Sequence, residues 1–225
     1  MTLQIRLQKR DLAHLERIRE IGQAALRQVI VELSKLPVAP CQPEKLHDSI
    51  SEALDGDVQR AEVLLRQLLS LNGMRRQLNL RSDEVFLGLD SGLRRGGWGQ
   101  EELAKWESVS GIFKELFDLP IVRLSAKALD LSYQHTHLFE RAQIITDIRP
   151  VFNDDATEIQ GTVVSHKLLL RYHDSMGTHE LSLAVDKKDI EALIQQCNRA
   201  LKKSETVKVQ LKDKVGLETL IPGQD

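Results

Sequence analysis

The most regular alternation of apolar and polar positions lies in the last third of the chain, over residues 142–208. Residues 142–152 alternate in character at every second position, which is the period of a β-strand with two different faces. Residues 162–172 and 179–186 are also rich in β-branched and apolar side chains and are bounded by turn formers. The pattern therefore predicts three strands in succession.

The second and third strands are predicted to form a hairpin around Asp174-Ser175-Met176-Gly177, which is rich in turn-forming residues. Pairing His173 with Thr178 fixes the register. The pairs that follow are Tyr172–His179, Leu170–Leu181, Leu168–Leu183, His166–Val185 and Arg171–Glu180. This register aligns one apolar face and also matches opposite charges, whereas a slip by one residue would reverse both faces.

A helix is predicted to follow the third strand. Asp186 is placed as its N-cap and Asp189 as the acid of a capping box. Its apolar positions recur at helical spacing: Ile190, Leu193, Ile194, Cys197 and Leu201. We expect this stripe to cover one face of the sheet, with Cys197 as a small apolar residue in that core.

The other face of the predicted sheet carries Ile145, Val151, Val163 and Leu169. A single helix cannot cover both faces of a three-stranded sheet, and such a sheet has two open edges. A partner surface is therefore expected on this second face. The hypothesis is that the partner is a second copy of the chain, so that the protein is a homodimer.

The order of strand, apolar hairpin with a short Asp/Gly turn, and closing amphipathic helix resembles the COMM-domain family over about the last hundred residues. The sequence departs from that family in having no Trp in the first strand, where residues 142–148 read Ala-Gln-Ile-Ile-Thr-Asp-Ile, and no Pro before the second strand. Residues 144–152 and 163–166 are also similar to uncharacterised bacterial proteins, which imply no activity. The COMM resemblance implies a helical N-terminal domain, a dimerising C-terminal domain and the role of an adaptor subunit.

Helical periodicity dominates the rest of the chain, so the predicted fold class is α+β: an all-helical N-terminal domain followed by a small three-stranded antiparallel sheet closed by the C-terminal amphipathic helix. Residues 1–7 alternate and are predicted as a short strand or a fraying lead-in. The first three predicted helices span about residues 9–36, 43–54 and 57–71; Pro43 opens the second, Asp57 caps the third, and Asn72-Gly73 stops it. A fourth helix is predicted to begin at Ser82, and a fifth spans about 100–117 and is ended by Pro120. The last is predicted over about 124–142, with a strand as the alternative for 124–133. The predicted domains are a helical bundle over 1–119, the β3α module over 120–210 and a frayed tail over 211–225.

Composition narrows the classes of function. The chain has 225 residues, of which 41% are hydrophobic and 28% charged, and a net charge of −2, so there is no electrostatic case for binding nucleic acid. It contains no apolar run of 18 residues and no signal-peptide pattern, so we expect a cytoplasmic protein that does not bind membranes. Two cysteines, Cys41 and Cys197, do not make a disulfide framework.

Candidate chemistry is sparse. Five histidines gather in the second half of the chain, but no metal-ligand spacing supports them: His135, His137, His166, His173 and His179. The glycine-rich loop Arg94–Gly99 precedes a helix and has two arginines, yet it lacks a Walker or Rossmann pattern, and packing of Trp98 against the bundle is the favoured interpretation. The acidic loop Asp154-Asp155 with Glu158 is typical of solvated turns.

Two hypotheses follow from the sequence. The first is a non-enzymatic adaptor without a cofactor that self-associates through its β3α module and binds an unknown protein partner, with Ile145, Val151, Val163, Leu169 and Trp98 as candidate interaction residues. The alternative is an enzyme or ligand sensor whose site lies between the domains and uses the Arg94–Gly99 loop and a histidine.

Overall fold

The structure is a computed structural model in which residues 5–223 are described; residues 1–4 and 224–225, which belong to the predicted lead-in and tail, lie outside that range. The chain forms two compact units. The helical unit comprises the residues up to Ser132 together with the segment from Gly216, and the β unit comprises Tyr133–Val215. The fold is α+β, with helices first, then one three-stranded antiparallel sheet and a helix after it.

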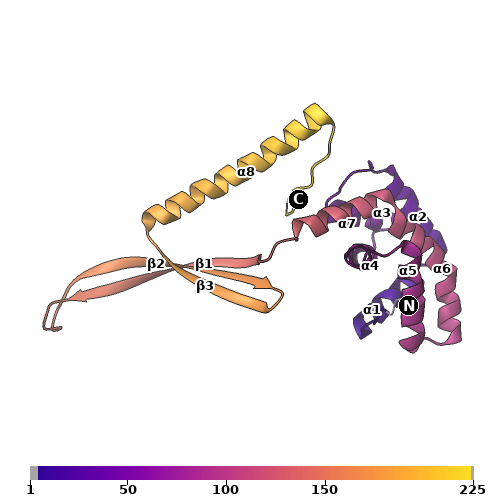
Figure 1. Cartoon of the computed structure of the whole chain (residues 1–225), viewed down its shortest axis with the longest axis horizontal. Helices are drawn as coiled ribbons and strands as arrows, with labels where there is room; N and C mark the ends of the chain where they lie inside the picture. The colour runs from indigo at the N-terminus through magenta and orange to yellow at the C-terminus, as the bar shows by residue number, and fades with distance from the viewer. Residues whose placement is uncertain (1–4, 224–225) are drawn as a thin grey trace. The chain divides into compact units, whose positions relative to one another are not determined.

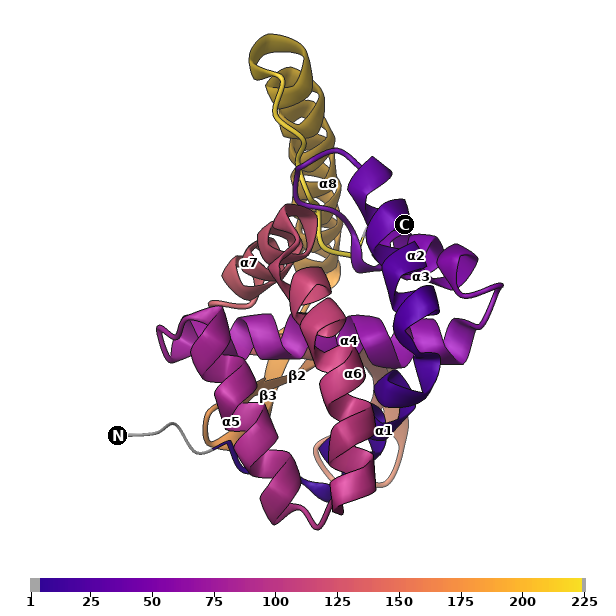
Figure 2. The ribbon, with the colours of Figure 1, turned by 90° about the vertical axis from the view of Figure 1, so that its right-hand side faces the viewer.

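Seven helices build the described part of the helical unit (Figures 1 and 2). Their bounds are α1 Lys9–Ile21, α2 Gln23–Lys35, α3 Pro43–Ala53, α4 Val58–Gln77, α5 Ser82–Arg95, α6 Gln100–Asp118 and α7 Pro120–Ser132. Helix α4 runs across the unit and packs on α1, α3, α5, α6 and α7. Residues 5–8 are not in a strand.

The prediction of one helix over residues 9–36 is wrong, because the chain breaks between α1 and α2 at Gly22. Gly22 has φ of +81°, a conformation that L side chains rarely adopt. The break lets two short helices pack on different neighbours: α1 lies against α4 and α6, and α2 lies against α3 and α6.

Helix α4 begins as predicted and ends later than predicted. The Asp57 side chain caps it by accepting a hydrogen bond from the Arg60 backbone N–H at 2.9 Å. Asn72-Gly73 does not stop the helix, which continues to Gln77. Asn72 is fully buried, and its Nδ2 donates to the carbonyls of Leu68 and Phe117 at 3.1 Å each. The bond to Phe117 on α6 is a tertiary contact that holds Asn72 in the helix despite its low propensity for helix interiors.

Pro120 does more than end α6, because it is the first residue of α7. Residues 124–132 are helical, so the strand alternative is wrong there, and the predicted extension of that helix to Ala142 is also wrong because β1 has begun by Leu138. The boundary between the units accordingly follows Ser132 and not residue 119, since α7 packs on α4 and α6.

The hydrophobic core lies almost entirely in the helical unit. Its largest fully buried side chains include Trp106, Phe113 and Phe117. Phe86 packs edge-on against both phenylalanines, with ring centroids 5.8 and 5.5 Å away, and Trp106 Nε1 donates to Asp90 at 2.9 Å. Aromatic side chains are scarce in the sequence and are concentrated here, where they contribute most to burial.

The β unit is a sheet in the order β1-β2-β3, with β1 Leu138–Phe152, β2 Ile159–Asp174 and β3 Gly177–Val185 (Figure 1). The predicted hairpin register is confirmed: the partners of β2 in β3 are the ones that the sequence pairs, from His166↔Val185 to His173↔Thr178. Helix α8, Lys187–Val215, follows with the predicted capping box, in which Asp186 and Asp189 accept each other's backbone N–H at 2.9 and 3.0 Å.

Two predictions about the end of the chain are wrong. Helix α8 does not cover the sheet: all of its residues are described, and none of them is buried. The predicted tail from residue 211 is helical to Val215, and the segment after it belongs to the helical unit, where Gln42 Nε2 donates to the Ile221 carbonyl at 2.5 Å.

Candidate functional site: the uncovered surfaces of the β unit

The first face of the sheet is the face that carries Leu168 and the residues paired with it, and it is apolar and uncovered. The register places Ile144 and Leu183 on either side of Leu168, and Ile148 opposite Val164. Ile148 is 69% exposed, and Leu183 is 41% exposed. Among residues 133–215, all of which are described, Leu168 is the only buried hydrophobic side chain. The β unit thus has an apolar face but no core of its own.

The apolar stripe of α8 is uncovered as well. Leu193, Ile194 and Leu201 are exposed, and Leu201 reaches 69%. Cys197 is also exposed, so the prediction that it lies in a helix–sheet core is wrong. Figure 1 shows α8 diverging from the sheet as an extended rod. An amphipathic helix of this length derives most of its stability from packing of its apolar face, which this stripe does not receive within one chain.

The end of the β1–β2 hairpin extends beyond β3 as a two-stranded ribbon. Strand β3 pairs with β2 only from His166 onward, so residues 159–165 of β2 are bonded to β1 alone. Ile159, Val164 and Phe152 lie on this ribbon, and each is at least half exposed. Because a two-stranded ribbon is marginally stable in water, exposed aliphatic side chains here favour contact with another surface.

The candidate residues of the second face lie together in two diagonal pairs. Ile145 is opposite Lys167 and Leu169 is opposite Gln143, which places Ile145 and Leu169 diagonally on one face. Val151 and Val163 are related in the same way further along and are 45% and 52% exposed. The prediction that these four residues share one face of the sheet is therefore confirmed. This second face is more polar than the first, because charged residues lie between the four on the same face.

The charges of α8 and of the strands are opposite in sign. Residues 187–215 contain eight Lys and Arg against four Asp and Glu, whereas residues 138–185 contain four Lys and Arg against seven Asp and Glu. The helix therefore carries a net charge of +4 and the strand region a net charge of −3. The register puts Asp147, Lys167 and Glu180 on the second face, and the acids of residues 153–158 lie in the loop between β1 and β2, so this negative charge is not on the first face.

The Arg94–Gly99 loop is packed within the helical unit. Trp98 contacts Trp106 edge-on with ring centroids 6.2 Å apart, and the Arg19 guanidinium lies 4.9 Å from the centroid of the Trp98 ring. A Cβ at Gly96 would lie 2.7 Å from Leu12 Cδ2, so the close approach of α1 accounts for a glycine there.

Both arginines of this loop have protein partners. Arg94 pairs with Glu107 at 3.8 Å. Arg95 donates to the carbonyls of Ser91 and Ile5 at 3.2 Å each. The loop geometry is thus explained by packing and local hydrogen bonds.

Histidines gather at one end of the sheet, around the turn at Asp174. His179 stacks on Tyr172 with ring centroids 5.4 Å apart, and His137 meets the same ring edge-on at 5.0 Å. His179 Nε2 lies 3.0 Å from Asp174 Oδ1. The Met176 backbone N–H, which donates to Asp174 at 2.7 Å, lowers the pKa of that carboxyl, and His179 contributes further. His137 lies between α7 and β1, so it is not on the helix predicted over residues 124–142, which ends at Ser132.

The remaining chemical candidates have structural surroundings. Within residues 5–223, no group of three or more His, Cys, Asp or Glu side chains is arranged to hold a metal ion. In the acidic loop, the Asn153 side chain closes the turn by accepting hydrogen bonds from the backbone N–H groups of Thr157 and Glu158. Burial raises the pKa of the Cys41 thiol, and the Cys41 backbone N–H donates to Ser125 Oγ.

Sequence reasoning missed the first face and the two-stranded ribbon as candidate surfaces, because it assigned α8 to cover the first face. Strand lengths carry a signal for the ribbon: β2 is longer than β3, so part of β2 cannot find a partner there. Nothing in the pattern of α8 indicates whether its stripe contacts its own sheet or another surface.

Comparison with family models and with curated sequences gives no match. Each helix within the described residues is too short or too polar to cross a lipid bilayer.

Proposed function

We propose that the protein is a non-enzymatic adaptor that self-associates through its β unit, with α8 of each copy covering the first face of the other copy's sheet. The observation that carries this proposal is the absence of a core in residues 133–215, where Leu168 alone is a buried hydrophobic residue. Ordering a sheet and a long helix costs conformational entropy that must be offset by burial of apolar surface. A second chain supplies that surface.

A second copy supplies a helix long enough for the first face of the sheet. Helix α8 has 29 residues and is about 43 Å long. This length exceeds that of β3 and is most of the length of β2. Reciprocal exchange satisfies both copies at once, because each chain donates one stripe and offers one face, as in an isologous two-fold interface.

The adaptor role rests on the helical units and the second sheet faces, which the proposed dimer leaves uncovered. Each copy retains its own helical unit, which has a complete core. The second face of each sheet, with Ile145, Val151, Val163 and Leu169, stays available to an unidentified protein partner, and Trp98 is a further candidate contact on the helical unit. Bringing together two identical helical units is a non-catalytic function.

Light scattering coupled to gel filtration tests the proposal. The full chain should elute with twice its mass of 25.5 kDa. Leu183→Asp on the first face should give the single mass, whereas Val163→Asp on the second face and Gln195→Asp on the polar side of α8 should remain dimeric. Circular dichroism serves as the control that the helical unit is still folded. A monomeric wild-type chain, or dissociation by Val163→Asp but not by Leu183→Asp, would refute the exchange.

A further inference from the structure

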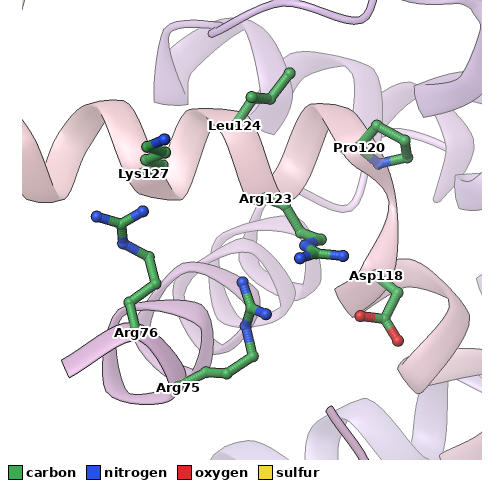
Figure 3. Close-up of a pocket in the computed structure, with 7 residues that line it drawn as sticks. All are labelled: Arg75, Arg76, Asp118, Pro120, Arg123, Leu124 and Lys127. Carbon is green, nitrogen blue, oxygen red and sulfur yellow. The ribbon is translucent and has the colours of Figure 1, made fainter. Parts of the chain in front are cut away.

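A cationic cavity lies in the helical unit, between the end of α4 and the beginning of α7 (Figure 3). It has a volume of about 460 Å³. Arg75 and Arg76 come from the last turn of α4, whereas Arg123 and Lys127 stand one turn apart on α7. We call it the arginine cavity. Its size falls in the range of cavities that hold small molecules.

Two of the cationic groups point toward each other across this cavity. Figure 3 shows the guanidinium groups of Arg75 and Arg123 approaching one another from α4 and α7. Burial lowers the pKa of Arg75 and the charge of Arg123 lowers it further, whereas the charge of Asp118 acts in the opposite direction. Guanidinium groups do not deprotonate in proteins, so this repulsion is not relieved by loss of a proton. An anion between them would relieve it.

Two carboxylates offset part of this charge, and Asp118 is itself in the lining of the cavity. Asp130 pairs with Arg76 at 3.1 Å, and Asp118 accepts a hydrogen bond from Ser82 Oγ at 2.5 Å. Within residues 5–223, neither Arg75 nor Arg123 forms an ion pair with a carboxylate. Four cationic side chains and one carboxylate, Asp118, line the cavity, and Asp130 pairs with Arg76, so positive charge is in excess there.

Arg75 is fixed in place even though its bonding is incomplete. Its guanidinium lies 5.8 Å from the centroid of the Phe117 ring, and its Nε is buried without a hydrogen-bond acceptor in the described part of the chain. An unsatisfied buried donor costs free energy and calls for an explanation. Here the arrangement holds a charged side chain in position before any ligand arrives, which reduces the entropy lost on binding.

We propose that the arginine cavity binds the phosphate group of a small phosphate monoester. Arg75 and Arg123 match phosphate oxygens through two-pronged hydrogen bonds, and Lys127 adds a third positive charge. Pro120 and Leu124 line the same cavity and provide apolar contacts for the organic part of the ligand. The site lies within the helical unit, so this inference stands apart from self-association.

Calorimetric titration of the full chain tests this inference, with inorganic phosphate, phenyl phosphate and benzoate compared at constant ionic strength. Phenyl phosphate should bind more tightly than inorganic phosphate, and both more tightly than benzoate. Arg123→Gln should weaken phenyl phosphate binding by about tenfold or more, because a charge-assisted hydrogen bond is lost. Lys127→Gln should weaken it less.

Arg94→Gln is the matched control, because Arg94 is an exposed arginine of the same unit outside this cavity. It should leave the affinity unchanged. Absence of binding by phenyl phosphate, equal binding of benzoate, or equal effects of Arg94→Gln and Arg123→Gln would each overturn the proposal. Arg123 is exposed and has no ion pair, so its replacement should not unfold the chain; thermal unfolding without ligand checks this.

Discussion

Truncation of Leu201 to alanine should weaken self-association strongly. Leu201 lies on the apolar stripe of α8 and is 69% exposed in the single chain. Full burial of a leucine side chain contributes about 1.5–3 kcal/mol, so covering the exposed part of Leu201 would contribute about 1–2 kcal/mol. A two-fold dimer contains this contact twice, and the loss is therefore about 2–4 kcal/mol. The dissociation constant should rise by about 30-fold to several hundred-fold.

Sedimentation equilibrium over a series of concentrations measures that change. Alanine favours helices more than leucine does, so a weaker dimer cannot be attributed to loss of intrinsic helix propensity. Leu87→Ala is the matched control, because Leu87 is a leucine of α5 in the helical unit that is 62% exposed. The reasoning is refuted if Leu201→Ala changes the dissociation constant by less than about threefold, or if Leu87→Ala weakens the dimer equally.

Further predictions concern stability. Asn72→Ala should lower the free energy of unfolding in urea by about 1–3 kcal/mol, since the buried carbonyl on α6 loses its donor; an unchanged midpoint would contradict this. Gly22→Ala should lower the free energy of unfolding by about 1–2 kcal/mol because Gly22 has a positive φ. Gly73→Ala within α4, where a Cβ meets no atom within 4 Å, should raise it by about 0.5–1 kcal/mol. Changes of the opposite sign would refute these two predictions. The pKa of Asp174 is lowered, so the charged carboxylate stabilises the turn above its unfolded pKa, and this is lost as the pH falls through the folded value. The protection factor of the Met176 amide, which is the ratio of the intrinsic exchange rate at each pH to the observed rate, should fall on acidification in the wild type and less in Asp174→Asn; identical pH profiles would argue against that role.

The β-hairpin could be predicted in detail because several local signals agree on it. The apolar face, the Arg171–Glu180 pair and the Asp174 turn all require the same register, and the structure has that register. The starts of α3 and α4 were likewise predictable, since Pro43 and Asp57 act within one helical turn.

Errors arose where tertiary contacts override local preference. The apolar stripe continues across Gly22, so periodicity alone does not reveal the break between α1 and α2. The Asn72-Gly73 pair reads as a stop signal, but the bond from Asn72 to the Phe117 carbonyl keeps it helical. Leu138 fits both the helical and the strand period, which obscured the start of β1.

The candidate site was only partly predictable for a related reason. An amphipathic stripe shows that α8 needs an apolar partner surface, but it does not identify that surface. Because the sequence pattern assigns α8 to its own sheet, it predicts the interaction surface on the second face and not on the first face, which carries Leu183. The arginine cavity was not anticipated either, because Arg75 and Arg123 are far apart in the sequence and meet only through packing of α4 on α7.

Isotope-filtered NMR on a mixture of labelled and unlabelled chains tests the exchange of α8 most directly. The experiment detects only contacts between different copies. Exchange predicts intermolecular NOEs between the methyl groups of Leu201 or Leu193 on α8 and those of Leu168 or Leu183 on the sheet. The absence of such NOEs, with the same methyl contacts seen only within one chain, would contradict the proposed dimer.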